Sequence, residues 1–112
     1  MTAGRRIEPL ATMTHHAYDM EGPVQPEMSY AAQSYDKATG EGVYVMHMQP
    51  GAVTIPHTHK GREDFLILEG SVIESDGTRL KAGDFVSYAP GTHHHTRSET
   101  GCVLIGFDWK PR

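Results

Sequence analysis

The chain contains a single cysteine, Cys102, among its 112 residues, so no disulfide can form within it. Structural disulfides are typical of secreted proteins, and a chain without them fits a reducing compartment. The sequence also lacks long apolar runs. Its first residues, MTAGRRIEPLATM, contain no signal-peptide core, and no later segment reaches membrane length. We therefore expect a cytoplasmic protein that does not enter a membrane.

Positive charge is scarce as well. Ten Lys and Arg residues face 14 Asp and Glu residues, the formal net charge is −4, and the only adjacent basic residues are Arg5 and Arg6. A surface that binds nucleic acid or anionic lipid needs a basic cluster that neutralises phosphates. The composition argues against both partners, and the length fits a single domain.

The patterning of the chain changes near residue 41. Residues 1–40 hold three of the seven prolines and few apolar runs, and we expect an N-terminal arm with a short strand or two that packs on the body or on a partner subunit. Residues 41–112 alternate short β-branched and aromatic segments with Gly and Pro turns. The expected strands are GVYVMHMQ, AVTIPHTH, DFLILEG, SVIES, TRLKAGD, FVSYAPG, HHHTRSETG and CVLIGFDW. This pattern predicts an all-β antiparallel sandwich or barrel, with a hairpin at Gly70 and another at Asp76-Gly77.

The segment PHTHKGREDF combines two histidines and a glutamate at close spacing. Side chains alternate across a strand, so His57 and His59 point to one face. Val53 and Ile55 share their parity, and we therefore expect that face to be the inner one. If KGR reverses the chain, Glu63 on the next strand faces the same interior. A hairpin would then deliver two imidazoles and one carboxylate to one place.

These residues belong to a longer spacing. A His-x-His pair alone is more often an inert part of a polar loop. Here the pattern extends through Gly51, His57, His59, Glu63 and Gly70. Glycine averages about 7% of residues and histidine is rarer, so chance explains this pattern poorly. The segment resembles the first motif of the cupin superfamily at every position.

The segment GDFVSYAPGTHHHTRS, residues 83–98, is similar to the second cupin motif. Gly83, Gly91 and His94 fall in register, while Ala89 stands in place of the expected proline and Ser98 in place of the expected asparagine. The resemblance implies the cupin fold, a small antiparallel double-stranded β-helix or jelly-roll barrel. The metal ligands that it implies are His57, His59, Glu63 and His94.

Three consecutive histidines leave the choice of the fourth ligand dependent on register. If His94 points inward, Thr96 and Ser98 do so too, and His93 and His95 point outward or toward the barrel mouth. A register shift of one residue would exchange the two sets. The motif favours His94, and the roles of His93 and His95 stay open.

A narrower resemblance lies in HTHKGREDFLILEGSV, the APG turn and SETGC. These segments look like the cupin branch that includes the metal domain of ChrR-type anti-sigma factors, and small cupin dioxygenases for acetylacetone and dihydroxyacetophenone are similar in style. Ser98 and Cys102 fit the ChrR-like branch better than the general motif. The sequence shows no counterpart of the separate sigma-binding domain of such a regulator.

The donor set of three imidazoles and one carboxylate suits one divalent transition metal per chain: Fe, Zn, Mn, Ni or Cu. An octahedral metal keeps two open positions for O2 and a chelating substrate. A zinc ion in a closed tetrahedron would be structural or sensory, and a five-coordinate zinc with water would act as a Lewis acid. The sequence does not choose between these states.

Further pocket residues can be named, although we assign no catalytic residue. Tyr44, His47 and Tyr88 lie on strands that border the barrel and could orient a ligand or transfer a proton. Core or rim packing is the simpler explanation for the two tyrosines, and His47 is either a buried histidine or a pocket residue. Cys102 and the methionines of strand 42–48 are expected to pack in the core.

The resemblance therefore implies a metal-dependent small cupin. The first hypothesis is an enzyme, dioxygenase-like, that acts on a small chelating carbonyl or organic-acid compound. The alternatives are a non-redox lyase, isomerase or cyclase, and a non-catalytic zinc sensor or binding module. Small cupins commonly pair, and an open sandwich leaves edge strands to cover, so we expect a homodimer.

Overall fold

The computed structural model describes residues 3–20 and 22–109. These residues form ten strands and one short 3-10 helix, Leu10–Thr12. The strands are β1 (His16–Tyr18), β2 (Gln25–Ala32), β3 (Gly42–Met48), β4 (His57–Thr58), β5 (Glu63–Glu74), β6 (Arg79–Lys81), β7 (Phe85–Tyr88), β8 (His93–His94), β9 (Thr96–Arg97) and β10 (Cys102–Asp108). All pairings between them are antiparallel, and the prediction of a single all-β domain is confirmed.

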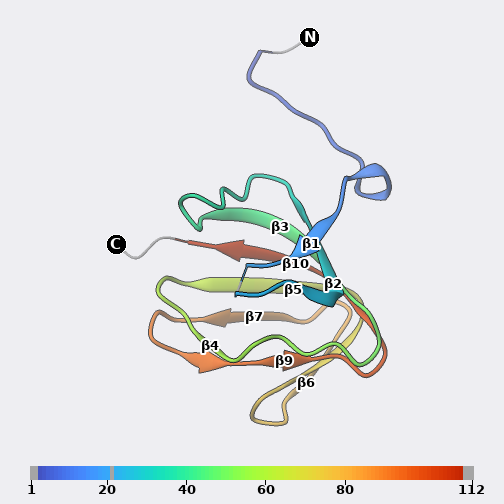
Figure 1. Cartoon of the computed structure of the whole chain (residues 1–112), viewed down its shortest axis with the longest axis vertical. Coiled ribbons are helices and arrows are strands. Elements are labelled where there is room, and N and C mark those ends of the chain that lie inside the picture. The colour runs from blue at the N-terminus through green and yellow to red at the C-terminus, as the bar shows by residue number, and fades with distance from the viewer. Residues whose placement is uncertain (1–2, 21, 110–112) are drawn as a thin grey trace.

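Strand β5 organises the fold. The main sheet runs in the order β1-β2-β3-β10-β5-β6, with β7 and β9 also paired to β5, while β4 and β8 form a separate two-stranded sheet. The first half of β5 pairs with β10 and β7, and its second half pairs with β6 and β9. Figure 1 shows β3, β10, β5 and β7 side by side, with β4 and β9 on the lower part of the curled body.

The expected hairpin at Gly70 is wrong, because β5 continues without a break from Glu63 to Glu74. Gly70 has a φ of +76°, and a Cβ at this position would collide with the carbonyl oxygen of Gly101. The glycine thus permits the backbone at Gly101 to approach closely, and it does not form a turn. The reversal comes later, where the Gly77 N–H donates to the Glu74 carbonyl at 2.8 Å, as the Asp76-Gly77 pair predicts.

The core is formed mainly by inward-facing side chains of the main sheet. Its buried members are Tyr18, Met28, Tyr30, Tyr44, Met46, Met48, Ala52, Phe65, Ile67, Val72, Cys102 and Leu104. The predicted packing roles of Cys102 and of the methionines on β3 are therefore confirmed. Burial of each large apolar side chain contributes about 1.5–3 kcal/mol to folding.

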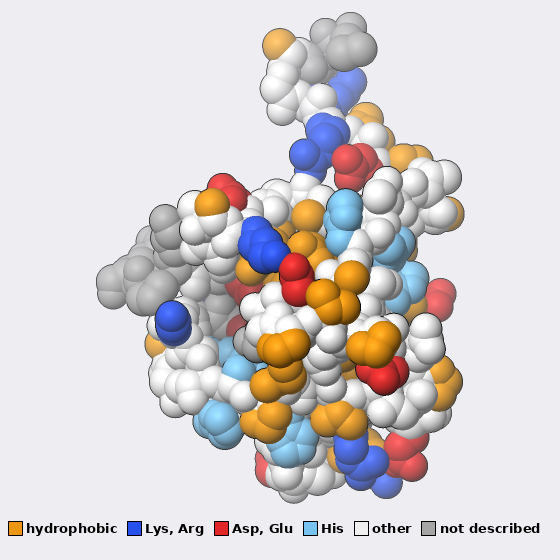
Figure 2. Space-filling view, in the orientation of Figure 1, with side chains coloured by type: hydrophobic (Ala, Val, Ile, Leu, Met, Phe, Trp, Pro, Cys, Tyr) orange, Lys and Arg blue, Asp and Glu red, His pale blue; other side chains and the backbone are white. Residues whose placement is uncertain are grey.

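The first 40 residues contribute β1 and β2, which extend the main sheet beyond β3. Met28 and Tyr30 on β2 are buried in the core. The segment that precedes β1 projects away from the sheets in Figure 1. On the face seen in Figure 2, hydrophobic side chains gather near the centre, with charged side chains of both signs around them. No helix in the described part of the chain combines the length and apolar character that crossing a membrane requires.

Candidate metal centre

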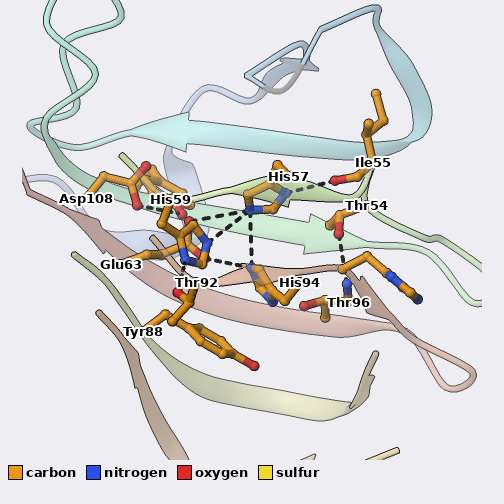
Figure 3. Close-up of polar contacts among 12 residues, drawn as sticks. Thr54, Ile55, His57, His59, Glu63, Tyr88, Thr92, His94, Thr96 and Asp108 are labelled. Carbon is orange, nitrogen blue, oxygen red and sulfur yellow. Dashed lines mark hydrogen bonds and ion pairs between the residues drawn. The ribbon is translucent and has the colours of Figure 1, made fainter. Parts of the chain in front are cut away.

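Four side chains named from the sequence meet at one end of the barrel. His57 lies on β4, His59 directly follows this strand, Glu63 begins β5 and His94 ends β8. One ligand atom from each residue lies within 4.8 Å of those of the others. Figure 3 shows the imidazoles and the carboxylate pointing toward one another. The structure thus brings the complete predicted set together.

The ligands do not converge through the expected hairpin. β4 pairs with β8, so His57 lies opposite His94 and Thr58 opposite His93. Glu63 belongs to the main sheet, where its register partners are Tyr88 on β7 and Asp108 on β10. The histidines therefore approach from the small sheet and the carboxylate approaches from the main sheet.

The expected inner face of the segment before His57 is also wrong. Val53 is 45% exposed, while its neighbours Ala52 and Thr54 are 1% and 5% exposed. Thr54 is held inward because its N–H donates to the Thr96 carbonyl and its hydroxyl accepts from the Thr96 N–H, each at 2.8 Å. Ile55 is half-buried and shares the parity of His57 and His59, so the phase of the alternation changes between Thr54 and Ile55.

The orientation of the histidine run is as predicted. The side chains of His94, Thr96 and Ser98 are all buried. His93 is exposed, and its Nδ1 lies 2.8 Å from the hydroxyl of Thr58 on the outer side of the small sheet. His95 is half-buried, and its N–H donates to Ser75. The register therefore directs His94, and not its neighbours, to the centre.

The separations among the four groups fit a metal ion. The Nε2 atoms of His59 and His94 each lie 3.1 Å from His57 Nε2 and 3.4 Å from a Glu63 carboxylate oxygen. The remaining carboxylate oxygen lies 3.9 Å from His57 Nε2. With metal–ligand bonds of about 2.1 Å, ligands at right angles lie about 3.0 Å apart and tetrahedral ligands about 3.4 Å apart. Neighbouring imidazole nitrogens at these separations favour a shared cation.

The other ring nitrogens of two histidines have partners that fix the tautomer. His57 Nδ1 lies 2.8 Å from the Ile55 carbonyl, which can only accept, so Nδ1 carries the proton. His59 Nδ1 lies 2.9 Å from the Thr92 hydroxyl, and that hydroxyl donates to the Ala89 carbonyl at 2.7 Å. His59 Nδ1 therefore donates as well. Both Nε2 lone pairs face the centre, as metal coordination requires.

Sequence reasoning missed Glu74, which lies beside His94. Glu74 is 4% exposed, and its Oε1 lies 3.3 Å from His94 Nδ1, without the alignment of a hydrogen bond. The Tyr88 hydroxyl donates to the same oxygen at 2.9 Å, and Thr96 makes a short contact to the other oxygen. The ring of Tyr88 also lies 4.3 Å from that of His94, centroid to centroid. A buried acid in the strand segment SVIES was the available signal.

The electrostatics of the centre favour a charged carboxylate. Burial opposes ionisation of Glu63, but the contacts from His59 and His94 outweigh it and lower its pKa to about 2. Burial also opposes the charged form of His94, yet Glu63 and Glu74 raise its pKa to about 9. Burial lowers the pKa of His57, and the bond to Ile55 offsets part of this effect. A metal would displace the proton from His94 Nε2, because only a neutral imidazole can coordinate.

A cavity of about 490 Å³ opens directly onto the centre. His57, His59 and Glu63 form its floor, and the connections β2–β3 and β4–β5 form its walls together with the end of β10. This volume lies in the range of small-molecule sites, which is roughly 300–1,000 Å³. The centre is therefore accessible to a small organic ligand from one side.

The remaining candidates lie at different distances from the centre. Tyr44 is a buried core residue, as expected, and its hydroxyl donates to Asp108 at 3.4 Å. Tyr88 combines rim packing with the contact to Glu74. His47 lies on β3 with its side chain outside the core cluster, half-buried, with its ring 4.2 Å from that of His15, centroid to centroid. The structure thus places Tyr88, but not His47, beside the proposed ligands.

Comparison with known proteins supports the cupin assignment. Residues 11–110 match the family described as ChrR Cupin-like domain. No curated protein sequence matches the chain. Among solved structures, an RmlC-like cupin from Shewanella frigidimarina aligns with a TM-score of 0.71 and 17% identity over 91% of this chain and 87% of the other.

Two further structural neighbours carry functional descriptions. The anti-sigma factor ChrR of Rhodobacter sphaeroides, in complex with SigE, aligns with a TM-score of 0.69 and 17% identity over 90% of this chain, which spans 52% of ChrR. The polyketide cyclase RemF of Streptomyces resistomycificus aligns with a TM-score of 0.71 and 16% identity over 91% of this chain and 77% of the cyclase. At these identities the likeness shows a shared fold.

Proposed function

This chain belongs to the ChrR cupin-like domain family, and we propose that it is a metal-dependent enzyme that acts on a small chelating carbonyl or organic-acid compound. The observation that carries the proposal is the pairing of the four-residue centre with the cavity above it. A purely structural metal site is closed by its ligands, whereas a catalytic site keeps a side open for substrate. Here the open side leads into the cavity, which has room for a small organic molecule.

The proposed ligands are His57, His59, Glu63 and His94. When bound, a divalent transition metal would supply a Lewis-acidic centre and, if redox-active, a site for chemistry with O2. The chain itself would hold the lone pairs of His57 and His59 inward through the protons on their Nδ1 atoms. Glu74 would hold the proton of His94 at Nδ1, so that Nε2 is free to coordinate.

A dioxygenase-like reaction is the more specific form of this proposal. In such a reaction both oxygen atoms enter the products and the substrate provides the electrons, so no external reductant is needed. An octahedral metal with four protein ligands keeps two further positions, and the cavity leaves room for a chelating substrate beside them. Glu74 and Thr96, which are buried beside His94, would limit access of water to that ligand.

Two other functions have specific support. The fold is shared with a polyketide cyclase, which favours a non-redox lyase, isomerase or cyclase as one alternative. The family match and the similarity to an anti-sigma factor favour a zinc sensor or binding module as the other. The first alternative keeps a substrate in the cavity, and the second predicts no turnover.

Metal analysis combined with oxygen uptake tests the proposal. Protein purified without a histidine tag would be analysed by elemental mass spectrometry and assayed with a panel of β-diketones and hydroxyketones. We expect near-stoichiometric iron and substrate-dependent oxygen uptake that the Glu63→Ala variant loses while it keeps its circular dichroism spectrum. Tightly held zinc without uptake would favour the sensor or the non-redox enzyme. Protein that neither contains nor regains metal would contradict the ligand assignment.

We also propose that the protein forms a homodimer. Three apolar residues outside the core cluster that are not fully buried, Ile105, Leu66 and Phe85, lie in register on the neighbouring strands β10, β5 and β7. Phe85, at one end of this row, is 58% exposed. A second copy could cover the row together with the edges of the sheets. Light scattering at micromolar concentration should give twice the monomer mass, and a monomer would refute this part.

A cytoplasmic location remains part of the proposal. Burial raises the pKa of Cys102 to about 12, so its thiol stays protonated at neutral pH. A single buried, protonated thiol fits a reducing environment, although it does not require one. Fractionation of cells that produce the protein would test the location directly.

A further inference from the structure

The cavity above the proposed metal centre is more basic than the chain as a whole. Lys37, Lys60 and Arg62 line it. Apart from Glu63, the one acidic residue that lines it in the described part of the chain is Asp108. The complete chain has a formal net charge of −4, so this concentration of positive charge is local.

The three cations differ in their partners. Lys37 is neutralised by Asp19, whose carboxylate oxygen lies 2.5 Å from its Nζ. Within residues 3–20 and 22–109, no acidic side chain forms an ion pair with Lys60 or Arg62. Two positive charges at the cavity rim are therefore available to a ligand.

Arg62 is also held in position. Its Nη1 donates to the Ser87 hydroxyl at 2.7 Å, and its carbonyl accepts from the Trp109 N–H at 3.0 Å. These contacts reduce the entropy that an arginine loses on binding a ligand. Arg62 and Lys60 flank Gly61 in the short connection between His59 and Glu63. The two cations therefore border the same cavity as the proposed ligands.

We propose that the natural substrate is a chelating organic anion whose carboxylate is bound by Lys60 and Arg62. This inference rests on the proposed function and narrows its substrate class. A divalent metal and Glu63 together keep one positive charge, and the two rim cations outweigh Asp108. A ligand that chelates through two oxygens and carries a carboxylate complements both parts, and arginine binds carboxylates through parallel hydrogen bonds.

Two β-diketones that differ in charge test this assignment. Acetylacetone and acetylpyruvate share a chelating unit, and acetylpyruvate also carries a carboxylate. Their binding to the zinc-loaded protein, which avoids turnover, would be measured by isothermal titration calorimetry. We expect acetylpyruvate to bind about tenfold more tightly, with the difference reduced in about 0.5 M salt. Because the two compounds also differ in acidity, the change of their affinity ratio between variants is the decisive quantity.

The double variant Lys60→Met, Arg62→Gln should bring this ratio close to one while the zinc content is retained. Lys37→Met is the matched control, because Lys37 lines the same cavity but is paired with Asp19. It should keep most of the preference. An unchanged ratio in the double variant would overturn the inference. Failure of the protein to bind zinc, or of zinc-loaded protein to bind either diketone, would instead contradict the proposed function.

Discussion

The two ends of the barrel use the same strands for different purposes. At one end, Glu63 on β5 lies opposite Asp108 on β10, and both border the cavity. At the other end, Ile67 lies opposite Leu104 on the same two strands, and both are buried in the core. Along this part of the two strands, the alternation of side chains sets which residues face inward. The comparison shows that the residue types at the inward positions, and not the backbone pairing, distinguish a polar site from a packed core.

Burial of charged groups at the polar end makes the free energy of folding less favourable, and apolar burial at the other end makes it more favourable. Buried carboxylates cost stability unless other groups compensate them. Glu74 has contacts to His94, Tyr88 and Thr96, and Glu63 faces histidines. Apolar burial at the other end offsets the remaining cost. Substitutions at the two ends should therefore change different quantities.

The largest expected effect is on metal affinity at the polar end. Four-ligand sites bind with roughly 10–16 kcal/mol, so one ligand contributes about 3–4 kcal/mol, or several hundredfold in affinity. We expect His94→Ala to lose this much, as measured by competition with a chromophoric chelator. His93→Ala is the matched control, because its side chain lies on the other face, and it should bind normally. The reverse result would show that the register of β8 is wrong.

The apolar end should respond in stability instead. Leu104 is 2% exposed and lies in the core cluster. Leu104→Ala should lower the free energy of unfolding by about 2–5 kcal/mol, because it removes buried surface and leaves a cavity. Urea denaturation of the metal-free protein would measure the loss. The folded variant should still bind one metal per chain, and loss of stoichiometry would argue that the two ends are not separable.

A smaller effect on metal affinity is expected from Glu74, which lies beside His94 at the polar end. Glu74→Gln keeps the shape of the side chain but removes the charge beside His94 Nδ1. Such a change typically weakens metal affinity about 10–100-fold. Glu69→Gln, an exposed position on the same strand, is the control and should change nothing. Equal affinities for both variants would reduce Glu74 to a packing residue.

The smallest effect concerns pH. The pKa of His94 is raised from 6.5 to about 9 in the metal-free fold, so its contribution to stability is complete below 6.5 and is lost as pH rises through about 9. Between these values the melting temperature should fall, by roughly 4–8 °C for each 1 kcal/mol of this contribution in a small domain. Metal-loaded protein should not show this decline, because coordination keeps His94 neutral. A His94→Ala variant that declines equally would refute the assignment.

The resemblance to the two cupin motifs named His57, His59, Glu63 and His94, the four residues that the structure brings together. Strand alternation alone left the choice between His94 and its neighbours to the register, which the structure supplies. The way they converge was not predictable from local rules. β4 pairs with β8, which lies far from it in the chain. The sequence had instead suggested that the strand with His57 pairs with the nearby strand that begins at Glu63.

Other errors have equally physical causes. Gly70 is compatible with a turn or with close backbone approach, and only the position of Gly101 decides between them. The burial of Thr54 in place of Val53 depends on hydrogen bonds to Thr96, which lies on another strand. Glu74 could not be recognised as a partner of His94 before the sheets were placed. Each missed feature depends on a tertiary contact.

Because the proposed donors are divided between two sheets, a metal bound at this centre would also cross-link the sheets. The histidines come from the small β4–β8 sheet, which is joined by few strand hydrogen bonds, and Glu63 comes from the long strand β5. A ligand that binds only the folded state stabilises it by RT ln(1 + [L]/Kd), about 4 kcal/mol at a thousandfold excess over Kd. Metal would therefore suppress local opening of β4 and β8 most of all, and amide hydrogen exchange there should slow on loading. The ion would therefore hold the β4–β8 sheet against β5.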